Sequence, residues 1–297
     1  MRKILTIDVG GTFTKYAVMM GMRTFKITVH GKTPTIKKNH AEFMEGLADI
    51  FNAHDDVEGI GISMPGLIDT DKGICISSEP FKFANGHNIA EELKAMCGVP
   101  ATVENDANCA ALAEIKSGCL TDVKDAFVLV FGTAVGGAFI RNREIYRGAH
   151  NCAGEVSFTL KSPVCVMNEK NFYVNDISAL AFQKICAKVL NMPPEEITGE
   201  MIFDLIDEND DDMLDALYKF AHGVAVKIFN LQMLFDPERF ALGGGISERQ
   251  SFIAAVHDKL NELCEKVPDY LPRPEVVACK YQNDANLFGA LYRYLRK

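Results

Sequence analysis

The sequence predicts an α/β protein built from two domains. Its 297 residues exceed the roughly 100–200 residues of a single domain. Short apolar runs rich in β-branched residues alternate along the chain with segments whose apolar residues have helical spacing. A strand, a glycine turn and a second strand follow one another twice, near residue 10 and near residue 134. This repetition suggests a weakly duplicated architecture.

The first half of the chain is expected to open with a β-hairpin. Residues 3–9 and 14–20 are apolar β-type runs, and Gly10-Gly11 lies between them. The elements expected after the hairpin are a helix over 39–53, a strand over 57–64 that ends at Pro65-Gly66, a short helix over 88–96 capped by Asn88, a strand over 100–103 and an alanine-rich helix over 105–117.

The second half is expected to begin with another hairpin, formed by strands over 126–131 and 138–140 around a glycine turn at 132–137. The elements expected beyond it are a loop over 159–175, a helix over 177–190, an acidic turn or helix start over 207–212, a helix over 214–235, a strand over 239–242, a turn at 243–245, a helix over 247–264 with Ser247 and Gln250 as a capping box, and a final helix over 286–295.

Composition excludes several classes of function. Thirty-one Lys and Arg against 40 Asp and Glu give a net charge of −9, so nucleic acid is not expected as the main partner. No apolar stretch approaches the ~20 residues of a membrane span, and the N-terminus lacks the apolar core of a signal peptide. The nine cysteines are scattered and form no CxxC pair. We therefore expect a cytoplasmic protein with reduced thiols, no membrane partner and no cysteine-rich zinc site.

The segment Asp8-Val9-Gly10-Gly11-Thr12 places a carboxylate at a strand end, beside glycines that let the backbone approach a phosphate. Asp8 is a candidate Mg²⁺ ligand, directly or through water, because hard cations prefer carboxylate oxygens. A strand follows these glycines, whereas a Walker loop requires a Lys and a helix. A plain tight hairpin is the alternative interpretation.

Two further glycine turns have similar properties. Residues 132–137 offer backbone amides and the hydroxyl of Thr133, and Gly243–Gly245 lie between a strand and a helix. A glycine-rich hairpin and a packing turn are the respective alternatives. Three such turns in one chain favour nucleotide binding over these alternatives.

A strand meets a helix at Glu104-Asn105-Asp106-Ala107-Asn108. A carboxylate in the first helical turn is stabilised in its ionised form, and it can accept a proton from an alcohol that attacks phosphorus. Simple N-capping by Asn105 or Asp106 is the alternative. Glu155, at the end of a glycine-containing turn, can accept hydrogen bonds from a polyol, and a surface acid is its alternative.

These residues resemble the motifs of the ROK family of repressors and bacterial sugar kinases. The matching segments, in chain order, are Asp8-Val9-Gly10-Gly11-Thr12, Met64-Pro65-Gly66-Leu67-Ile68-Asp69, Glu104-Asn105-Asp106-Ala107-Asn108, Gly132-Thr133-Ala134-Val135-Gly136-Gly137, Ala153-Gly154-Glu155 and Gly243-Gly244-Gly245-Ile246-Ser247. The resemblance implies the actin-like ATPase fold, with two RNase H-like domains around a central cleft. We expect these domains to comprise 1–107 plus 283–297 and 108–282.

The resemblance also implies roles for individual residues. Asp106 resembles the general base on the sugar hydroxyl, and Asn105, Glu155 and Gly66 resemble sugar-binding residues. Asp8 would lie near Mg²⁺. The residues expected to bind ATP are Gly10, Gly11, Thr12, Gly132, Thr133, Gly136, Gly243, Gly244 and Gly245. The family implies a homodimer, and the first motif begins too early for the helix-turn-helix of the repressor branch.

The chain departs from the family pattern around the sugar pocket. Phe158 occupies the place of the family's zinc-binding His, and only Cys165 remains of the cysteine cluster. Val174 aligns with a later sugar-binding Glu, and His87 aligns with a frequent Trp. We therefore expect no structural zinc in this segment, substoichiometric zinc in the purified protein, and a loop around Glu155 that packing holds in place.

The sequence thus predicts an ATP- and Mg²⁺-dependent kinase that phosphorylates a hexose or hexose derivative at its 6-hydroxyl. Glucokinase, β-glucoside kinase and N-acetylmannosamine kinase activities remain open as alternatives. A sugar-binding regulator without catalysis is the alternative of another class, although such a sensor would need neither Asp8 nor Asp106.

Overall fold

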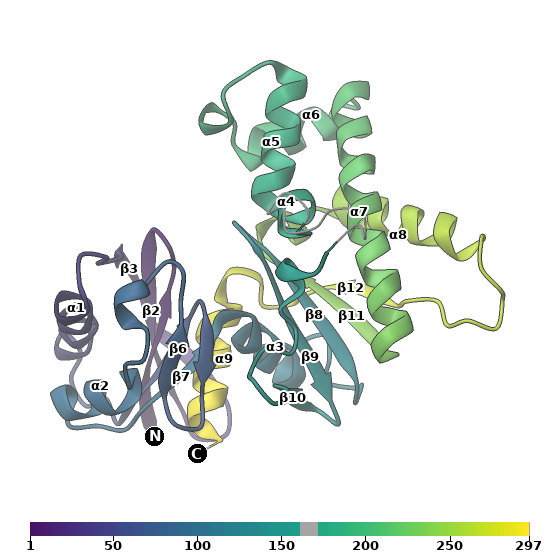
Figure 1. The fold of residues 1–297 in the computed structure, drawn as a ribbon. Helices are drawn as coiled ribbons and strands as arrows, with labels where there is room; N and C mark the ends of the chain where they lie inside the picture. Colours follow the sequence, from purple (N-terminus) through teal and green to yellow (C-terminus); the bar gives the residue numbers. More distant parts are fainter. Residues whose placement is uncertain (161–171, 297) are drawn as a thin grey trace. The chain divides into compact units, whose positions relative to one another are not determined.

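Figure 1 shows the fold in a computed structural model, which describes residues 1–160 and 172–296. The protein is an α/β protein with two five-stranded mixed sheets, so the predicted class is confirmed. None of the described helices is both long and apolar enough to cross a membrane.

The chain forms two compact units. Unit 1 contains Met1–Lys116, Arg147–Cys152 and Asp284–Lys297, and unit 2 contains Ser117–Tyr146 and Ala153–Asn283. The predicted domain boundary after residue 107 would cut a helix that lies almost entirely in unit 1, and the short return of the chain to unit 1 after Tyr146 was not expected.

Unit 1 is built on a sheet of strand order β3-β2-β1-β4-β7. Strands β1, β2 and β3 pair antiparallel, whereas β4 and β7 join β1 in parallel. The elements of unit 1 are β1 (Arg2–Val9), β2 (Phe13–Gly21), β3 (Phe25–Pro34), α1 (His40–Asn52), β4 (Gly59–Met64), β5 (Leu67–Asp69), β6 (Ile74–Ser77), α2 (Ile89–Cys97), β7 (Ala101–Asn105), α3 (Asp106–Ser117) and α9 (Ala285–Leu295).

Alternation along β1 decides which residues face which helices. Leu5 and Ile7 belong to the apolar core that also contains residues of α1 and α2. Ile4 belongs to a second core formed with α9. Since successive side chains of a strand point to opposite faces, Asp8 shares the face of Ile4, and Asn286 of α9 indeed bonds to its carboxylate.

Unit 2 repeats the arrangement of unit 1. Its sheet has the order β10-β9-β8-β11-β12, with an antiparallel half and a parallel half in the same places. The expected duplication is therefore present in the topology. The elements of unit 2 are β8 (Ala126–Phe131), β9 (Val135–Arg141), β10 (Glu144–Tyr146), α4 (Val174–Ile177), α5 (Ala179–Leu190), α6 (Gly199–Asp207), α7 (Asp211–Phe235), β11 (Arg239–Gly243), α8 (Gln250–Cys264) and β12 (Val276–Ala278).

The helices of unit 2 form one core on its sheet. Helices α7 and α8 pack against each other, and buried residues of α5, α6, α7 and α8 share a cluster with Phe127, Leu129 and Phe240 of the strands. Side-chain caps fix where several helices begin: Ser178 accepts the amide of Ala181 at the start of α5, and corresponding caps precede α6 and α7.

Some local features differ from the predictions. Strand β3 was not expected, because as an edge strand without a buried residue it lacks a clear apolar pattern. Helix α6 was likewise not expected. The proposed capping box at Ser247 is wrong: its hydroxyl donates to the carbonyl of Gly244, and α8 begins only at Gln250.

Candidate functional site

Three parallel strands of unit 1 end at the same edge of the sheet. Asp8 on β1 pairs with Ser63 on β4, and Ser63 pairs with Glu104 on β7. The loop containing Gly66 and the first turn of α3 follow directly on β4 and β7. The register therefore brings the predicted residues Asp8, Gly66, Asn105 and Asp106 to one edge, which is where open α/β sheets bind ligands.

Asp8 is a buried carboxylate with one oxygen held by the protein. Its Oδ1 accepts hydrogen bonds from Ser63 Oγ at 3.0 Å and from Asn286 Nδ2 at 2.9 Å. Burial raises the pKa of Asp8 above its ordinary 3.8, and these two bonds oppose that rise. Both bonds end on Oδ1, so Oδ2 is left for a cation or for the water of a cation. This donor chemistry fits Mg²⁺.

The first glycine turn joins β1 to β2. The amide of Gly10 donates to the carbonyl of Phe13 at 3.1 Å, and the carbonyl of Gly10 accepts from Thr35 Oγ1 at 2.8 Å. Gly11 and Thr12 are exposed at the tip of the hairpin. The predicted hairpin is confirmed, and it presents its tip at the edge that contains Asp8.

Asp106 is the first residue of α3. Its Oδ1 accepts the amide of Ala107 at 2.8 Å and Nδ2 of Asn105 at 3.0 Å. Burial raises the pKa of Asp106 above 3.8, and the negative charge of Asp8 raises it further, whereas the two bonds oppose the rise. The carboxylates of Asp8 and Asp106 are thus close enough at this edge for their charges to repel each other.

The side chain of Asn105 is engaged within the protein. Its oxygen accepts the amide of Asn108 at 3.0 Å, which is N-capping of α3, and its Nδ2 also donates to the carbonyl of Gly66 at 3.0 Å. Asn105 therefore caps α3, and its contact with a sugar stays a prediction. Gly66 has a φ of 122°, and a side chain there would collide with the backbone of Ser77, so only glycine fits.

A buried ion pair between Glu104 and Arg147 stabilises this edge of the sheet, and the pair was not expected from the sequence. Glu104 is fully buried and forms a bidentate pair with Arg147, with N–O distances of 3.0 and 2.6 Å. Glu104 also accepts the amide of Asn105 and Nδ2 of Asn108. The sequence shows Glu104 as an acidic residue at the end of an apolar strand, but its partner Arg147 lies 43 residues later in the chain. No local pattern could have joined them.

Unit 2 brings the other two glycine turns together. β8 and β11 are parallel neighbours in which Gly243 pairs with Val130, so Gly132 and Gly245 follow at the same edge. Gly244 has a φ of 88°, and a Cβ there would lie 2.1 Å from the carbonyl oxygen of Phe131. This contact requires glycine and holds the two turns against each other.

Glu155 also belongs to unit 2. It follows Gly154, which lies against Gly137 of β9 so closely that a Cβ on Gly137 would be 2.3 Å from the Gly154 carbonyl oxygen. Glu155 is exposed and precedes a short 3₁₀ turn, Val156–Phe158. Thr133 is exposed in the second glycine turn, and Gly136 is partly buried on β9.

The segment after Glu155 has aromatic and cationic contacts. Phe158 is 63% exposed and meets the ring of Phe172 edge to face at 5.9 Å. Lys227 of α7, only 3% exposed, donates to Thr159 Oγ1 and lies 3.5 Å from the ring centre of Tyr173. Lys227 was not expected to be buried, because a Lys within a helix is usually exposed.

Two further residues were expected to differ from the family pattern, Val174 and Cys165. Val174 is the first residue of α4, and Cys165 lies outside the described residues. The expectation of no zinc in this segment stays a prediction.

Comparison with known proteins decides the family. The model of the ROK family matches residues 4–297. The chain belongs to the ROK family. A β-glucoside kinase of Listeria monocytogenes is 31% identical to this ROK protein over 99% of the chain and 98% of the relative. An N-acetyl-D-glucosamine kinase of Haemophilus influenzae is 26% identical over 98% and 99% of the two chains.

Solved structures agree with this assignment. A ROK family protein from Streptococcus pneumoniae, determined in complex with sucrose, superimposes with a TM-score of 0.87 at 27% identity and covers 99% and 98% of the two chains. The ROK protein described here therefore has the actin-like ATPase fold with two domains, as expected. It is an enzyme of the sugar-kinase type, a hexose phosphotransferase.

Proposed function

We propose that this ROK kinase transfers the γ-phosphoryl group of ATP to the 6-hydroxyl of a hexose or hexose derivative. The observation that supports this proposal most is the pair of buried carboxylates, Asp8 and Asp106, at the edge of the unit 1 sheet. Phosphoryl transfer needs positioning and charge stabilisation more than covalent chemistry, and an acid pair beside a glycine turn supplies both.

Asp106 is the proposed general base. An Asp whose pKa is raised by burial is a stronger base than an ordinary Asp. Because the bonds from Ala107 and Asn105 both end on Oδ1, Oδ2 is the oxygen available to accept the proton of the sugar hydroxyl.

Asp8 is the proposed residue for Mg²⁺, through its Oδ2 or through water. The metal would neutralise phosphate charge, and the amides of the glycine turns would bind the phosphates. Gly10, Gly11 and Thr12 are proposed for this role in unit 1, where Gly10 shapes the turn because its own amide already donates to Phe13. The residues proposed for this role in unit 2 are Gly132, Thr133, Gly136, Gly243, Gly244 and Gly245.

The proposed sugar-binding residues are Glu155, Asn105 and Gly66. Asn105 already bonds to Gly66 and Asn108, so its contribution to the sugar would come mainly from holding Asp106 in place. A β-glucoside is the first candidate substrate, because a β-glucoside kinase is similar to this chain along its whole length. Glucose and N-acetylhexosamines are the alternatives.

A coupled ADP-release assay over glucose, β-glucosides, N-acetylglucosamine and N-acetylmannosamine tests the proposal. We expect the highest kcat/KM with a β-glucoside, and NMR of the product should show the phosphate on the 6-oxygen. Sugar binding by calorimetry without ADP release from any of these sugars would instead support the sugar-binding regulator.

A further inference from the structure

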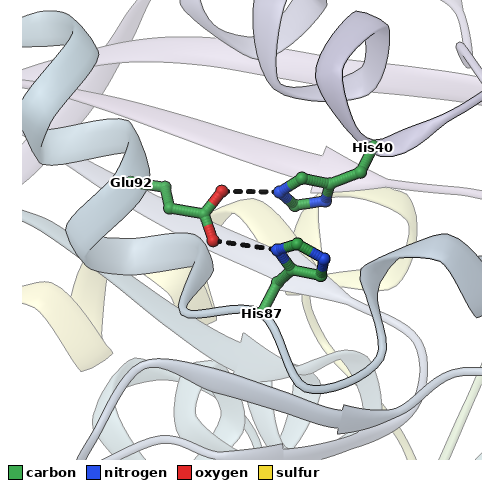
Figure 2. A group of neighbouring side chains, drawn as sticks. All are labelled: His40, His87 and Glu92. Carbon is green, nitrogen blue, oxygen red and sulfur yellow. Dashed lines mark hydrogen bonds and ion pairs between the residues drawn. The ribbon is translucent and has the colours of Figure 1, made fainter.

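Two histidines and a glutamate gather in unit 1, among residues that the proposed chemistry does not use. Figure 2 shows the carboxylate of Glu92 beside the two imidazoles, with one of its oxygens bonded to each ring. His40 is the first residue of α1, His87 lies in the loop before α2, and Glu92 is in the first turn of α2. The cluster therefore joins the beginnings of two helices that pack against each other.

The donor atoms of this cluster lie close enough together for one metal ion to contact all three residues. Glu92 Oε2 lies 2.5 Å from His40 Nε2, and Glu92 Oε1 lies 3.1 Å from His87 Nδ1. One donor atom from each residue can be chosen so that all three lie within 4.8 Å of one another. Zinc-type ions bind imidazole nitrogen and carboxylate oxygen at ~2.0–2.2 Å, so an ion bound here would replace the hydrogen bonds between Glu92 and the two imidazoles.

The protein does not satisfy this cluster by itself. His40 Nδ1 is buried and has no hydrogen-bond partner among the described residues. The two imidazole rings are stacked at 3.6 Å with an interplanar angle of 25° and share one carboxylate. A buried ring nitrogen without a partner requires an explanation, and an unseen ion or water is one of the usual ones.

The cluster is open to solvent. The side chains of His40, His87 and Glu92 are 18%, 43% and 37% exposed, so an ion can enter from solvent.

We propose that His40, His87 and Glu92 bind one divalent transition-metal ion of the Zn²⁺, Co²⁺ and Ni²⁺ class. Two nitrogens and one oxygen select such ions over Mg²⁺ and Ca²⁺, which prefer oxygen alone. Three protein ligands leave a position open to water, so the ion exchanges with solvent. This site differs from the closed zinc site that is not expected after Glu155, and substoichiometric zinc in the purified protein remains the expectation.

Metal-stripped protein titrated with Zn²⁺, and separately with Co²⁺, tests this site. We expect one ion per chain by calorimetry, a rise in Tm with added Zn²⁺, and visible absorption of Co²⁺ typical of nitrogen and oxygen ligands. Glu92→Gln keeps the shape of the side chain and removes a ligand charge, and His87→Gln removes one imidazole. Each substitution should weaken binding at least tenfold and abolish the rise in Tm.

His30→Gln is the matched control, because His30 also contacts a carboxylate in unit 1, that of Asp284 at 3.4 Å. It should bind Zn²⁺ as the unchanged protein does. Circular dichroism of the apo forms establishes that each variant is folded. The absence of stoichiometric binding, or equal affinity in the two cluster variants and the control, would overturn the proposal.

Discussion

At the scale of single residues, burial changes the basicity of Asp106 because it raises the pKa of this carboxylate. A buried carboxylate with a second one nearby holds its proton more tightly than a surface Asp. Asp106→Asn keeps the bond from the Ala107 amide and removes the base. General-base catalysis contributes about 10²–10⁴-fold, so we expect kcat to fall at least about a hundredfold while calorimetry shows little change in sugar affinity.

The pH profile distinguishes a base from a residue that only positions others. Asp106 must be ionised to accept a proton, so kcat/KM should decline as pH falls through a pKa above the ordinary 3.8 of Asp. This acid limb should be missing from the residual activity of Asp106→Asn. Asp49→Asn, at an exposed position of α1, is the control. Near-normal turnover in Asp106→Asn would show that another group is the base.

The pKa of Lys227 shifts in the opposite direction from that of Asp106, because burial disfavours the charged form of both groups. Burial lowers the pKa of Lys227 from 10.5 to about 8. Below pH 8 both folded and unfolded chains bind the proton, and the cost of the buried charge is constant. Between about 8 and 10.5 the unfolded chain binds more protons, so the contribution of this group to stability increases with pH.

Lys227→Met removes this charge at similar length. We expect the variant to be more stable than the unchanged protein at pH 7, and its advantage to shrink between pH 8 and 10. Urea unfolding followed by circular dichroism measures both, with Lys219→Met as an exposed control on the same helix. An advantage that stays constant across this range would mean that Lys227 titrates as an exposed Lys does.

The sequence could predict only part of the residue scale. Asp8 and Asp106 were recognisable because each lies in a short motif at the end of a strand. Arg147 and Lys227 were not, because their partners Glu104 and Thr159 lie 43 and 68 residues away. Pairing over such distances is decided by tertiary structure, which leaves no periodic signal.

At the scale of elements, strands that carry a glycine turn were the most predictable, since a hairpin needs only local geometry. Both hairpins were predicted, whereas the beginning of α8 was not. There, Gly243–Gly245 pack against β8 and continue into a 3₁₀ turn, Gly245–Glu248, before the helix begins. A contact with a strand more than a hundred residues earlier overrides the local capping signal.

Helices α9 and α3 approach each other so closely at Gly289 that no side chain fits between their backbones. A Cβ on Gly289 would lie 1.9 Å from the carbonyl oxygen of Cys109. Gly289→Ala gains about 1 kcal/mol of helix propensity, but the backbone cannot yield as a side chain does. Overpacking costs about 1–3 kcal/mol or more, so we expect a net loss of unfolding free energy in urea.

Gly199→Ala is the matched control for this substitution. Gly199 is the first residue of α6 and has open space where a Cβ would be. It should change stability by less than about 1 kcal/mol, in the stabilising direction. If Gly289→Ala were as stable as Gly199→Ala, the close approach of α9 to α3 would be wrong.

At the scale of the whole molecule, the two units share a topology but differ in how the chain completes them. Unit 2 is finished by residue 283, whereas unit 1 needs α9 from the last part of the chain. Leu287 and Leu291 of α9 are fully buried with Ile4 and Met19 of the first two strands.

A chain that ends at residue 283 should therefore lose the fold of unit 1 and keep that of unit 2. Without α9, Ile4 and Met19 would face water, and Asp8 would lose its bond from Asn286. Hydrogen exchange should show loss of protection in β1 and β2 and retained protection in β8 and β11. Protection of β1 equal to that in the full chain would contradict this dependence.

The late position of α9 also has a consequence during synthesis. A ribosome adds about 5–20 residues per second, so residues 2–21 wait on the order of tens of seconds for the helix that covers them. Unit 2, although it starts later, has all of its residues first. Through that interval the apolar face of β1 and β2 is open on the nascent chain. We therefore expect this face, more than any part of unit 2, to be the region that chaperones hold until α9 has been synthesised.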